Sequence, residues 1–199
     1  MIIVSKLLYQ GHASLRLTLN DERVIYIDPY AGAGYEKEAD FILITHQHHD
    51  HTAIHKVIQK DSCRIISNKE ALVSGEYKSF EFDGFKIQAV EAAGRMHPKD
   101  RCVGYILEFD GLTIYVSGDT AATEQMQTFA ERTIDYAFFC ADGIINMGLK
   151  ESANCAEMIK AKHNIPYHIA PGRLFSNRRA QKWTAPNKLI IEPGEEIEL

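Results

Sequence analysis

The sequence predicts an α/β fold in one domain that spans residues 1–199. Short alternating or continuous apolar runs, typical of β-strands, occur along the chain, and segments with helical spacing of apolar residues lie between them. No linker, repeat or low-complexity tract divides the sequence. At 199 residues we expect one compact core, because two independent domains would each be small.

Strands dominate the predicted first half. Residues 14–19 alternate between apolar and polar side chains, and a polar turn leads from them into 24–27, which is a hairpin pattern. Residues 41–44 form a continuous apolar run typical of a buried strand. We expect a helix over 53–60 and a short helical piece over 69–73.

The second half is expected to mix strands and helices more evenly. Residues 85–90 alternate again, and strands over 103–109 and 112–116 flank Asp110-Gly111, a dipeptide that favours a two-residue hairpin turn. Beyond this hairpin we expect a helix over 122–132, a buried strand over 136–139 and a helix over 151–163.

The most informative segment is residues 45–51, Thr-His-Gln-His-His-Asp-His, directly after the predicted strand 41–44. It contains the pattern H-x-H-x-D-H. Imidazole and carboxylate side chains together suit zinc and neighbouring divalent metals, and open α/β sheets place their chemistry at the carboxyl ends of strands. A histidine-rich solvated turn is the alternative, but short histidine tracts favour metal binding on composition alone.

This pattern resembles the signature of the metallo-β-lactamase fold superfamily, and later residues follow the superfamily's order. His97 follows Ala-Gly-Arg-Met, Asp119 lies in Ser-Gly-Asp-Thr after a predicted strand, and His168 lies in Ile-Pro-Tyr-His-Ile. Taken alone, each has an ordinary alternative: a loop histidine, a turn aspartate and a buried strand-end histidine. The resemblance implies a four-layer αββα sandwich, in which two mixed β-sheets are flanked by helices.

The resemblance also implies a ligand set for two divalent ions. His46, His48 and His97 would bind the first ion, Asp50, His51 and His168 would bind the second, and Asp119 would bridge them. Two such ions share a hydroxide by lowering the pKa of water towards ~7. Asp50 is the expected catalytic residue, orienting that water or accepting its proton. Zinc is the default metal and manganese the alternative.

Two further residues are expected to support the site. In related proteins the aspartate at the position of Asp28 supports the H-x-H-x-D-H loop, since a metal-bound imidazole needs its other N–H held; a strand-terminating Asp-Pro turn is the alternative. His12 either lines the site or satisfies a hydrogen bond in the core. Gly11-His12-Ala13-Ser14, Asp28-Pro29 and Asn146-Met147-Gly148 are similar to the branch that contains L-ascorbate-6-phosphate lactonase.

Substrate recognition is expected in the basic segment 173–188, which contains no acidic residue although the chain carries a net charge of −5. Arg173, Arg178 and Arg179 follow His168 closely and are able to clamp a phosphate or carboxylate. A solvated basic face is the alternative. We expect a metal-dependent hydrolase acting on a small anionic ester, lactone or phosphodiester.

Charge, cysteine content and hydropathy indicate which other partners and which compartment to expect. The net charge of −5 argues against a general nucleic-acid binder. The four cysteines form no C-x-x-C pair, which favours free thiols in a reducing cytoplasm. Residues 1–6 show no signal peptide, and no run approaches the ~18 apolar residues of a membrane span. Self-association into a homo-oligomer stays open.

Two other functions remain open from sequence. One is a metal-binding protein without hydrolase activity. The other is a mononuclear-iron redox enzyme of the same fold, which shares H-x-H-x-D-H but uses fewer of the late ligands. Di-iron, oxygen-reducing relatives usually carry glutamate at the position of His48, so histidine there favours hydrolysis.

Overall fold

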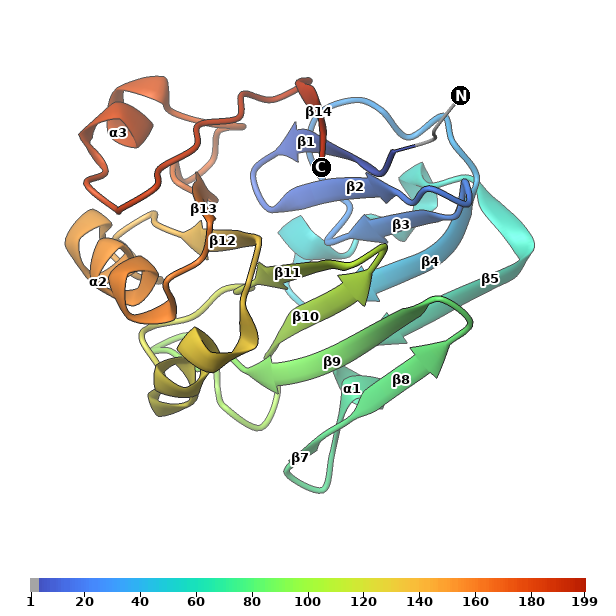
Figure 1. The fold of residues 1–199 in the computed structure, drawn as a ribbon, viewed down its shortest axis with the longest axis horizontal. Coiled ribbons are helices and arrows are strands. Elements are labelled where there is room, and N and C mark those ends of the chain that lie inside the picture. Colours follow the sequence, from blue (N-terminus) through green and yellow to red (C-terminus); the bar gives the residue numbers. More distant parts are fainter. Residues whose placement is uncertain (1–3) are drawn as a thin grey trace.

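The computed structural model describes residues 4–199, which form two six-stranded β-sheets packed face to face (Figure 1). Residues 1–3, part of the segment read for a signal peptide, lie outside the described residues. The first sheet has the order β14 (Glu196–Glu198), β1 (Lys6–Gly11), β2 (Ser14–Thr18), β3 (Val24–Ile27), β4 (Ala39–Ile44), β5 (Gln59–Ser67).

The second sheet has the order β13 (His163–Tyr167), β12 (Tyr136–Cys140), β11 (Leu112–Val116), β10 (Val103–Phe109), β9 (Phe85–Glu91), β8 (Ser79–Phe82). Both sheets are mixed. β3, β4 and β5 run parallel to one another, as do β11, β12 and β13, while the remaining neighbours pair antiparallel. A small hairpin of β6 (Leu72–Val73) and β7 (Glu76–Tyr77) projects beside them.

The core fills the space between the sheets, where inward-facing apolar side chains of both are fully buried. One polar contact also joins the two sheets. The Tyr105 hydroxyl on β10 lies 3.1 Å from the carbonyl oxygens of Ile44 and Ile66, which belong to β4 and β5. Because this buried hydroxyl has a partner inside the core, it fixes the relative position of the sheets without an unpaired polar group.

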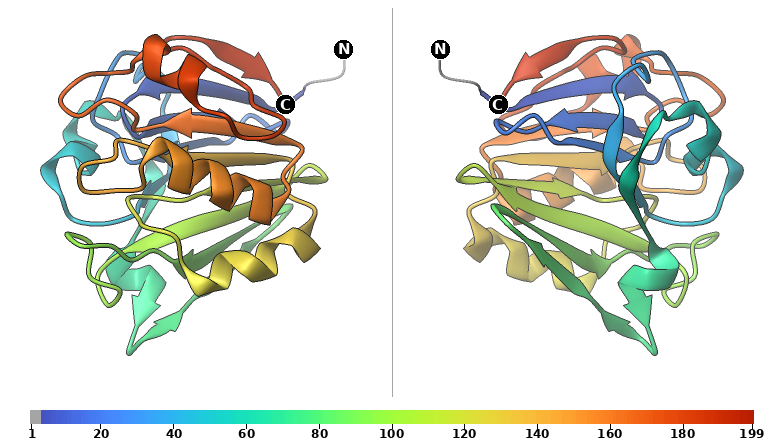
Figure 2. Two further views of the ribbon diagram at one scale, coloured as in Figure 1. Left: turned by 90° about the vertical axis from the view of Figure 1, so that its left-hand side faces the viewer. Right: turned by 90° about the vertical axis from the view of Figure 1, so that its right-hand side faces the viewer.

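Helices cover the outer face of the second sheet. The 3₁₀ helix η3 (Glu124–Arg132) and helix α2 (Leu149–Ile159) lie across it, with α3 (Asn177–Lys182) alongside (Figure 2). The buried Trp183 indole after α3 donates to Ser152 Oγ on α2 at 2.9 Å.

The outer face of the first sheet has a thinner cover. The 3₁₀ helices η1 (His49–His51) and η2 (Ile54–Lys56) follow β4, and α1 (Asn68–Ala71) follows β5. Ile54 and Val57 pack with the segment between β3 and β4 against Ile42 and Ile44. The predicted class, two mixed sheets with helices outside them, is confirmed.

Most predicted strands have the expected bounds within one residue, but three predicted helices differ. The predicted helix 53–60 is one 3₁₀ turn, η2, because the chain then pairs with β4 as the edge strand β5. The predicted helix 151–163 ends early: Lys160 has left-handed backbone with φ 59°, and His163 starts β13. The predicted helix 122–132 is the 3₁₀ helix η3.

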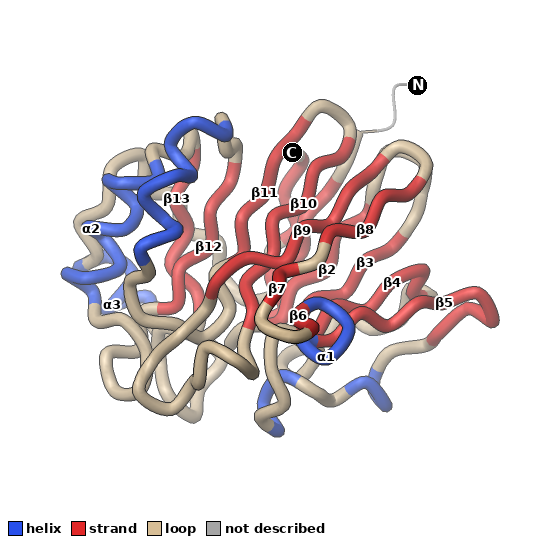
Figure 3. Tube along the Cα trace, turned by 90° about the horizontal axis from the view of Figure 1, so that it is seen from below, coloured by secondary structure: helices blue, strands red, loops and turns tan. Residues whose placement is uncertain are grey.

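The strand directions determine where the site lies. β1, β3 and β4 run the same way in the first sheet, and β9, β11, β12 and β13 run the same way in the second. The loops after these strands gather along one edge of the two sheets (Figure 3). They carry every predicted metal ligand.

Gly118, directly before Asp119, shows how tightly this edge is packed. Its φ is +61°, and a Cβ there would lie 2.7 Å from the Val103 carbonyl oxygen and 3.1 Å from Thr45 Cβ. We expect Gly118→Ala to lower the free energy of unfolding by more than the roughly 1–2 kcal/mol of left-handed backbone strain alone, because the added methyl also clashes. Urea unfolding measures this difference.

The matched control is Gly111→Ala in the β10–β11 turn. Its φ is +75°, but nothing lies within 4 Å of an added Cβ, so this variant carries the backbone strain without the clash. Equal losses of stability in the two variants would contradict the close approach at Gly118.

Candidate metal centre

Loops of both sheets bring the predicted ligands together. The first sheet supplies His12 after β1, Asp28 after β3 and the H-x-H-x-D-H segment after β4. The second supplies His97 after β9, Asp119 after β11 and His168 after β13. The cluster therefore lies at the interface of the two sheets.

One potential ligand group contains His46, His48 and His97, whose ligand atoms lie within 4.8 Å of one another. His46 Nε2 and His48 Nδ1 are 3.0 Å apart, close enough for both nitrogens to reach one ion. His46 and His97 are buried, whereas His48 is exposed. This side of the cluster is open to solvent through His48.

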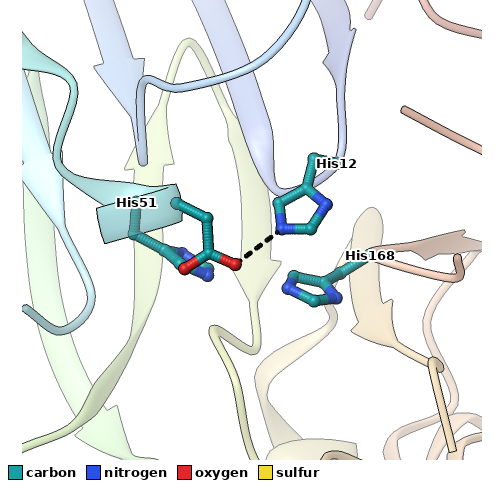
Figure 4. Close-up of side chains that lie close together, drawn as sticks. His12, His51 and His168 are labelled. Atoms are coloured by element: carbon teal, nitrogen blue, oxygen red, sulfur yellow. Dashed lines mark hydrogen bonds and ion pairs between the residues drawn. The ribbon is translucent and has the colours of Figure 1, made fainter. Parts of the chain in front are cut away.

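A second group contains His12, Asp50, His51 and His168, again with ligand atoms within 4.8 Å. Figure 4 shows the rings of His12, His51 and His168 directed towards one space. His12 Nε2 lies 3.1 Å from Asp50 Oδ2, and the His12 and His168 ring centroids are 3.9 Å apart. His12, expected either to line the site or to satisfy a hydrogen bond in the core, thus lies beside the predicted ligands of the second ion and close to Asp50.

Asp119 lies between the two groups. Its Oδ2 is 3.4 Å from Nε2 of His97 and 3.4 Å from Nε2 of His168, while Oδ1 is 3.5 Å from His51 Nε2. His97 comes from the first group, and His51 and His168 come from the second. The carboxylate thus has the position that a bridging ligand requires.

Asp28 and Thr45 hold the histidine loop from beneath. The Asp28 carboxylate accepts hydrogen bonds from Thr45 N (2.8 Å), Thr45 Oγ1 (2.6 Å) and His51 Nδ1 (2.8 Å). Thr45 Oγ1 also lies 3.0 Å from His46 Nδ1. With their Nδ1 atoms held, His46 and His51 direct Nε2 into the cluster, the arrangement that metal-binding histidines need.

The donor set fits divalent ions. Among residues 4–199, the Nε2 atoms of His51, His97 and His168 and the Oδ1 atom of Asp119 are buried and have no hydrogen-bond partner. Buried polar atoms without partners are costly, and several in one cluster require a compensating group. Ions coordinated by imidazole and carboxylate would satisfy all of them.

The surroundings keep most of these groups in the protonation state that a metal ligand needs. Burial lowers the pKa of His46 to about 2 and also lowers the pKa of His97 and His168, which keeps these imidazoles neutral at pH 7. Burial alone would raise the pKa of Asp119, but the nearby His51 and His168 hold it well below its usual range. The carboxylate is therefore ionised.

His51 differs from the other buried histidines. Burial lowers the pKa of its imidazole, but Asp119 and Asp28 on either side outweigh this and raise it well above the usual value. A proton therefore competes for His51.

Backbone strain is concentrated at the same edge. His12, Asp28 and His168 have φ values of 55°, 46° and 43°, which are uncommon for residues other than glycine. Strain of this kind costs about 1–3 kcal/mol per residue and persists only where the surroundings enforce it. Here the His168 N–H donates to the His12 carbonyl at 2.8 Å, and the Asp28 N–H donates to the Leu43 carbonyl at 2.9 Å.

Two clefts flank the cluster. One of about 610 Å³ is lined by His12, Asp50, Tyr30, Lys56 and Arg173 among others. The other, of about 680 Å³, lies beside His46 and His48, and its wall includes Lys69, Leu72, Met96 and Arg101. The potential ligands are thus reachable from two sides.

The structure separates the three arginines predicted to bind substrate. Arg173 lines the cleft beside Asp50. Arg178 is exposed on α3. Arg179 donates from Nη2 to the carbonyl oxygens of Ala141 (2.9 Å) and Asp142 (2.8 Å), so its guanidinium holds a loop.

Sequence reasoning missed three residues of this region: Thr45, Lys56 and Asp142. Thr45 was visible as the first residue of the histidine segment, but its bonds to Asp28 and His46 depend on the fold. Lys56 and Asp142 had no motif to mark them.

Comparison with known proteins places the chain in a family. The beta-lactamase superfamily domain matches residues 6–168. The chain belongs to this superfamily. The UPF0173 metal-dependent hydrolase of Pyrococcus furiosus is 29% identical, covering 98% of this chain and 99% of its own length. The corresponding protein of Thermococcus kodakarensis is 30% identical with the same coverage, 98% and 99%.

A solved structure agrees with these relatives. The crystal structure of a candidate metal-dependent hydrolase from Parabacteroides distasonis has a TM-score of 0.76 and 28% identity, covering 94% of this chain and 91% of its own. The protein is thus a metal-dependent hydrolase with the metallo-β-lactamase fold. The narrower resemblance to the ascorbate-phosphate lactonase branch stays a prediction.

Among the described residues, no helix combines the length and the apolar character needed to cross a bilayer.

Thr45 offers a test of how the loop supports its ligands. We expect Thr45→Val to lower the affinity of the His46 group for zinc by roughly 10–100-fold, because the hydroxyl that joins Asp28 to His46 Nδ1 is lost. Zinc retained after dialysis against chelators of graded strength, measured by elemental analysis, reports this affinity. Thr45→Ser keeps the hydroxyl and should retain zinc like the parent; a valine variant that does the same would refute the support role.

Proposed function

We propose that this protein is a dinuclear metal-dependent hydrolase that cleaves a small anionic ester, lactone or phosphodiester. The observation that carries the proposal is the pair of ligand groups on either side of Asp119. His46, His48 and His97 form one group, and Asp50, His51 and His168, with His12 beside them, form the other.

The residues of the two groups have distinct roles in this proposal. His46, His48 and His97 would hold one ion, Asp50, His51 and His168 the other, and Asp119 both. Two bound divalent ions, zinc or manganese, would supply a bridging hydroxide at neutral pH and polarise the scissile group.

Asp50 has the geometry of a residue that handles a proton near the reacting atoms. Its side chain is 24% exposed and lines the 610 Å³ cleft, and His12 Nε2 lies 3.1 Å from one carboxylate oxygen. Burial raises the pKa of Asp50, but the hydrogen bond from His12 and the charge of His51 outweigh it, so the carboxyl is ionised. An ionised, fixed carboxylate is able to orient water or accept its proton.

Lys56 and Arg173 support an anionic substrate. Both line the cleft that contains Asp50, and Lys56 Nζ is fixed by donating to the Tyr30 carbonyl at 2.6 Å. Cationic groups on the wall of a cleft attract an anion and hold it by charge-assisted hydrogen bonds. The second cleft, beside His48, would take the other part of the substrate.

The metal content tests the dinuclear site. We expect protein purified without added metal to carry two equivalents of divalent ion and His48→Ala to carry about one, because the first group loses a ligand. Elemental analysis measures both. His49→Ala removes the adjacent, exposed imidazole and should keep two equivalents. A single iron equivalent in the parent would favour the mononuclear redox enzyme instead, and unchanged content in His48→Ala would reject the ligand assignment.

Substrate charge tests the cleft. With bis(4-nitrophenyl) phosphate, we expect Arg173→Ala or Lys56→Met to lower kcat/KM by roughly 10–100-fold, the size of one hydrogen bond to a charged group. With neutral 4-nitrophenyl acetate the change should stay within about twofold, because that ester never used the cation. Arg178→Ala, exposed on α3, is the matched control. Equal losses on both substrates would indicate damaged packing instead of anion binding.

A further inference from the structure

His168 lacks the Nδ1 partner that His46 and His51 have, and His97 Nδ1 is likewise buried without one among the described residues. His46 Nδ1 meets Thr45 Oγ1 at 3.0 Å, and His51 Nδ1 meets Asp28 Oδ2 at 2.8 Å. His168 Nδ1 is buried and has no hydrogen-bond partner within residues 4–199. Oδ2 of Asp142 lies 3.5 Å from this Nδ1 atom.

Asp142 is a buried carboxylate with a fixed orientation. It is 2% exposed. Its Oδ1 accepts from the backbone N–H groups of Ile144 (2.6 Å) and Ile145 (3.1 Å), and its Oδ2 accepts from Asn146 Nδ2 at 2.6 Å. These bonds hold the carboxylate without using up Oδ2, since a carboxylate oxygen has two lone pairs.

The sheet and α3 fix where Asp142 lies. β12 and β13 pair in parallel with Cys140 opposite Tyr167, so the residues that follow these strands emerge side by side. Arg179 on α3 donates to the carbonyl oxygens of Ala141 (2.9 Å) and Asp142 (2.8 Å). The loop that carries Asp142 is therefore fastened at its start.

We propose that Asp142 is a positioning residue for His168, with Arg179 holding the loop that presents it. The carboxylate orients the imidazole through Nδ1, so that Nε2 is directed at Asp119 and at the ion shared with Asp50 and His51. This role rests on the proposed dinuclear site. It gives Arg179 a function at the metal centre other than the predicted contact with substrate.

The consequence is a measurable change in ion affinity. Carboxylates that hold the second nitrogen of a metal-binding histidine typically contribute 10–100-fold to affinity, because they fix the ring and raise its basicity. Asp142→Asn keeps the size of the side chain and an oxygen for the backbone N–H groups, but removes the charge. We expect it to weaken the second zinc by roughly 10–100-fold and to leave the first unchanged.

The experiment is zinc retention by the full chain during dialysis against chelators of graded strength, with thermal unfolding recorded in parallel. Asp135→Asn is the matched control. Asp135 is also buried and bonded, accepting from Thr113 N (2.8 Å) and Lys162 Nζ (2.7 Å), but it lies at the start of β12, away from the site. It should lose stability while retaining both zinc ions like the parent.

A second pair of variants decides the matter if Asp142→Asn does not fold. Arg179→Ala frees the loop without touching the carboxylate, and it should weaken the second zinc by several-fold. Arg178→Ala, the exposed neighbour on the same helix, should have no effect. Retention of the second zinc by Arg179→Ala as by Arg178→Ala would then overturn the proposal.

The outcomes separate this role from the function itself. A parent protein that holds fewer than two zinc ions overturns the dinuclear site, and the role of Asp142 with it. A parent that holds two, together with an Asp142→Asn variant that retains both as Asp135→Asn does, overturns only the positioning role.

Discussion

The burial of one carboxylate, Asp119, among imidazoles from both sheets is the constraint on which the site depends. At 2% exposure, with three histidine nitrogens at 3.4–3.5 Å, this carboxylate would be very costly to bury without polar partners. Those partners come from loops more than 100 residues apart in the chain, since His51 belongs to the first sheet and His168 to the second. The two sheets must therefore pack correctly for the carboxylate to be compensated.

The ligand residues differ in how firmly hydrogen bonds hold them, because they lie at different depths between the sheets. His51 lies deep between the sheets, where Asp28 reaches it, and Asp50 is met by His12. His48 extends to the surface and is exposed, because it lies in the turn between β4 and η1. The two sides of the cluster therefore suit different tasks. The hydrogen-bonded side, with His51 and Asp50, keeps the ligand atoms in position, and the exposed side, with His48, admits a ligand from solvent.

Sequence reasoning succeeded where a pattern is local. The polar turn before β3 and the Asp110-Gly111 turn between β10 and β11 marked these strands, whose predicted bounds agree to the residue, and the histidine segment marked the site from its own composition. The family resemblance then supplied the order of His97, Asp119 and His168, which no local spacing contains. The helix predicted over 53–60 failed because an edge strand is defined by its partner, and β5 has a polar sequence, Gln-Lys-Asp-Ser-Cys, at its start.

The site residues that the sequence did not predict were missed for a common reason. Thr45, Lys56 and Asp142 act through neighbours distant in sequence, and a lone threonine, lysine or aspartate is usually a surface or turn residue. The basic segment shows what composition leaves open. It predicted that Arg173, Arg178 or Arg179 would bind substrate; the chain turns into α3 after Phe175, so that Arg173 lines the cleft while Arg179 donates to the carbonyl oxygen after β12. Charge in a sequence does not specify which way a side chain points.

The charge distribution links the fold to the proposed chemistry. The chain carries −5 overall, yet the clefts beside the cluster contain Lys56 and Arg173 on one side and Lys69 and Arg101 on the other, with Asp100 near the latter pair. The net negative charge of the protein disfavours the binding of polyanions in general. The local cations at the clefts attract a small anion to one place. Protein walls screen charge less than water does, and the Asp119 and Asp28 carboxylates beneath the clefts are paired with imidazoles. The electric field of the lysine and arginine side chains is therefore concentrated at the clefts. In the proposed function, selectivity for a small anionic substrate would follow from where the cations lie and would need no net positive charge.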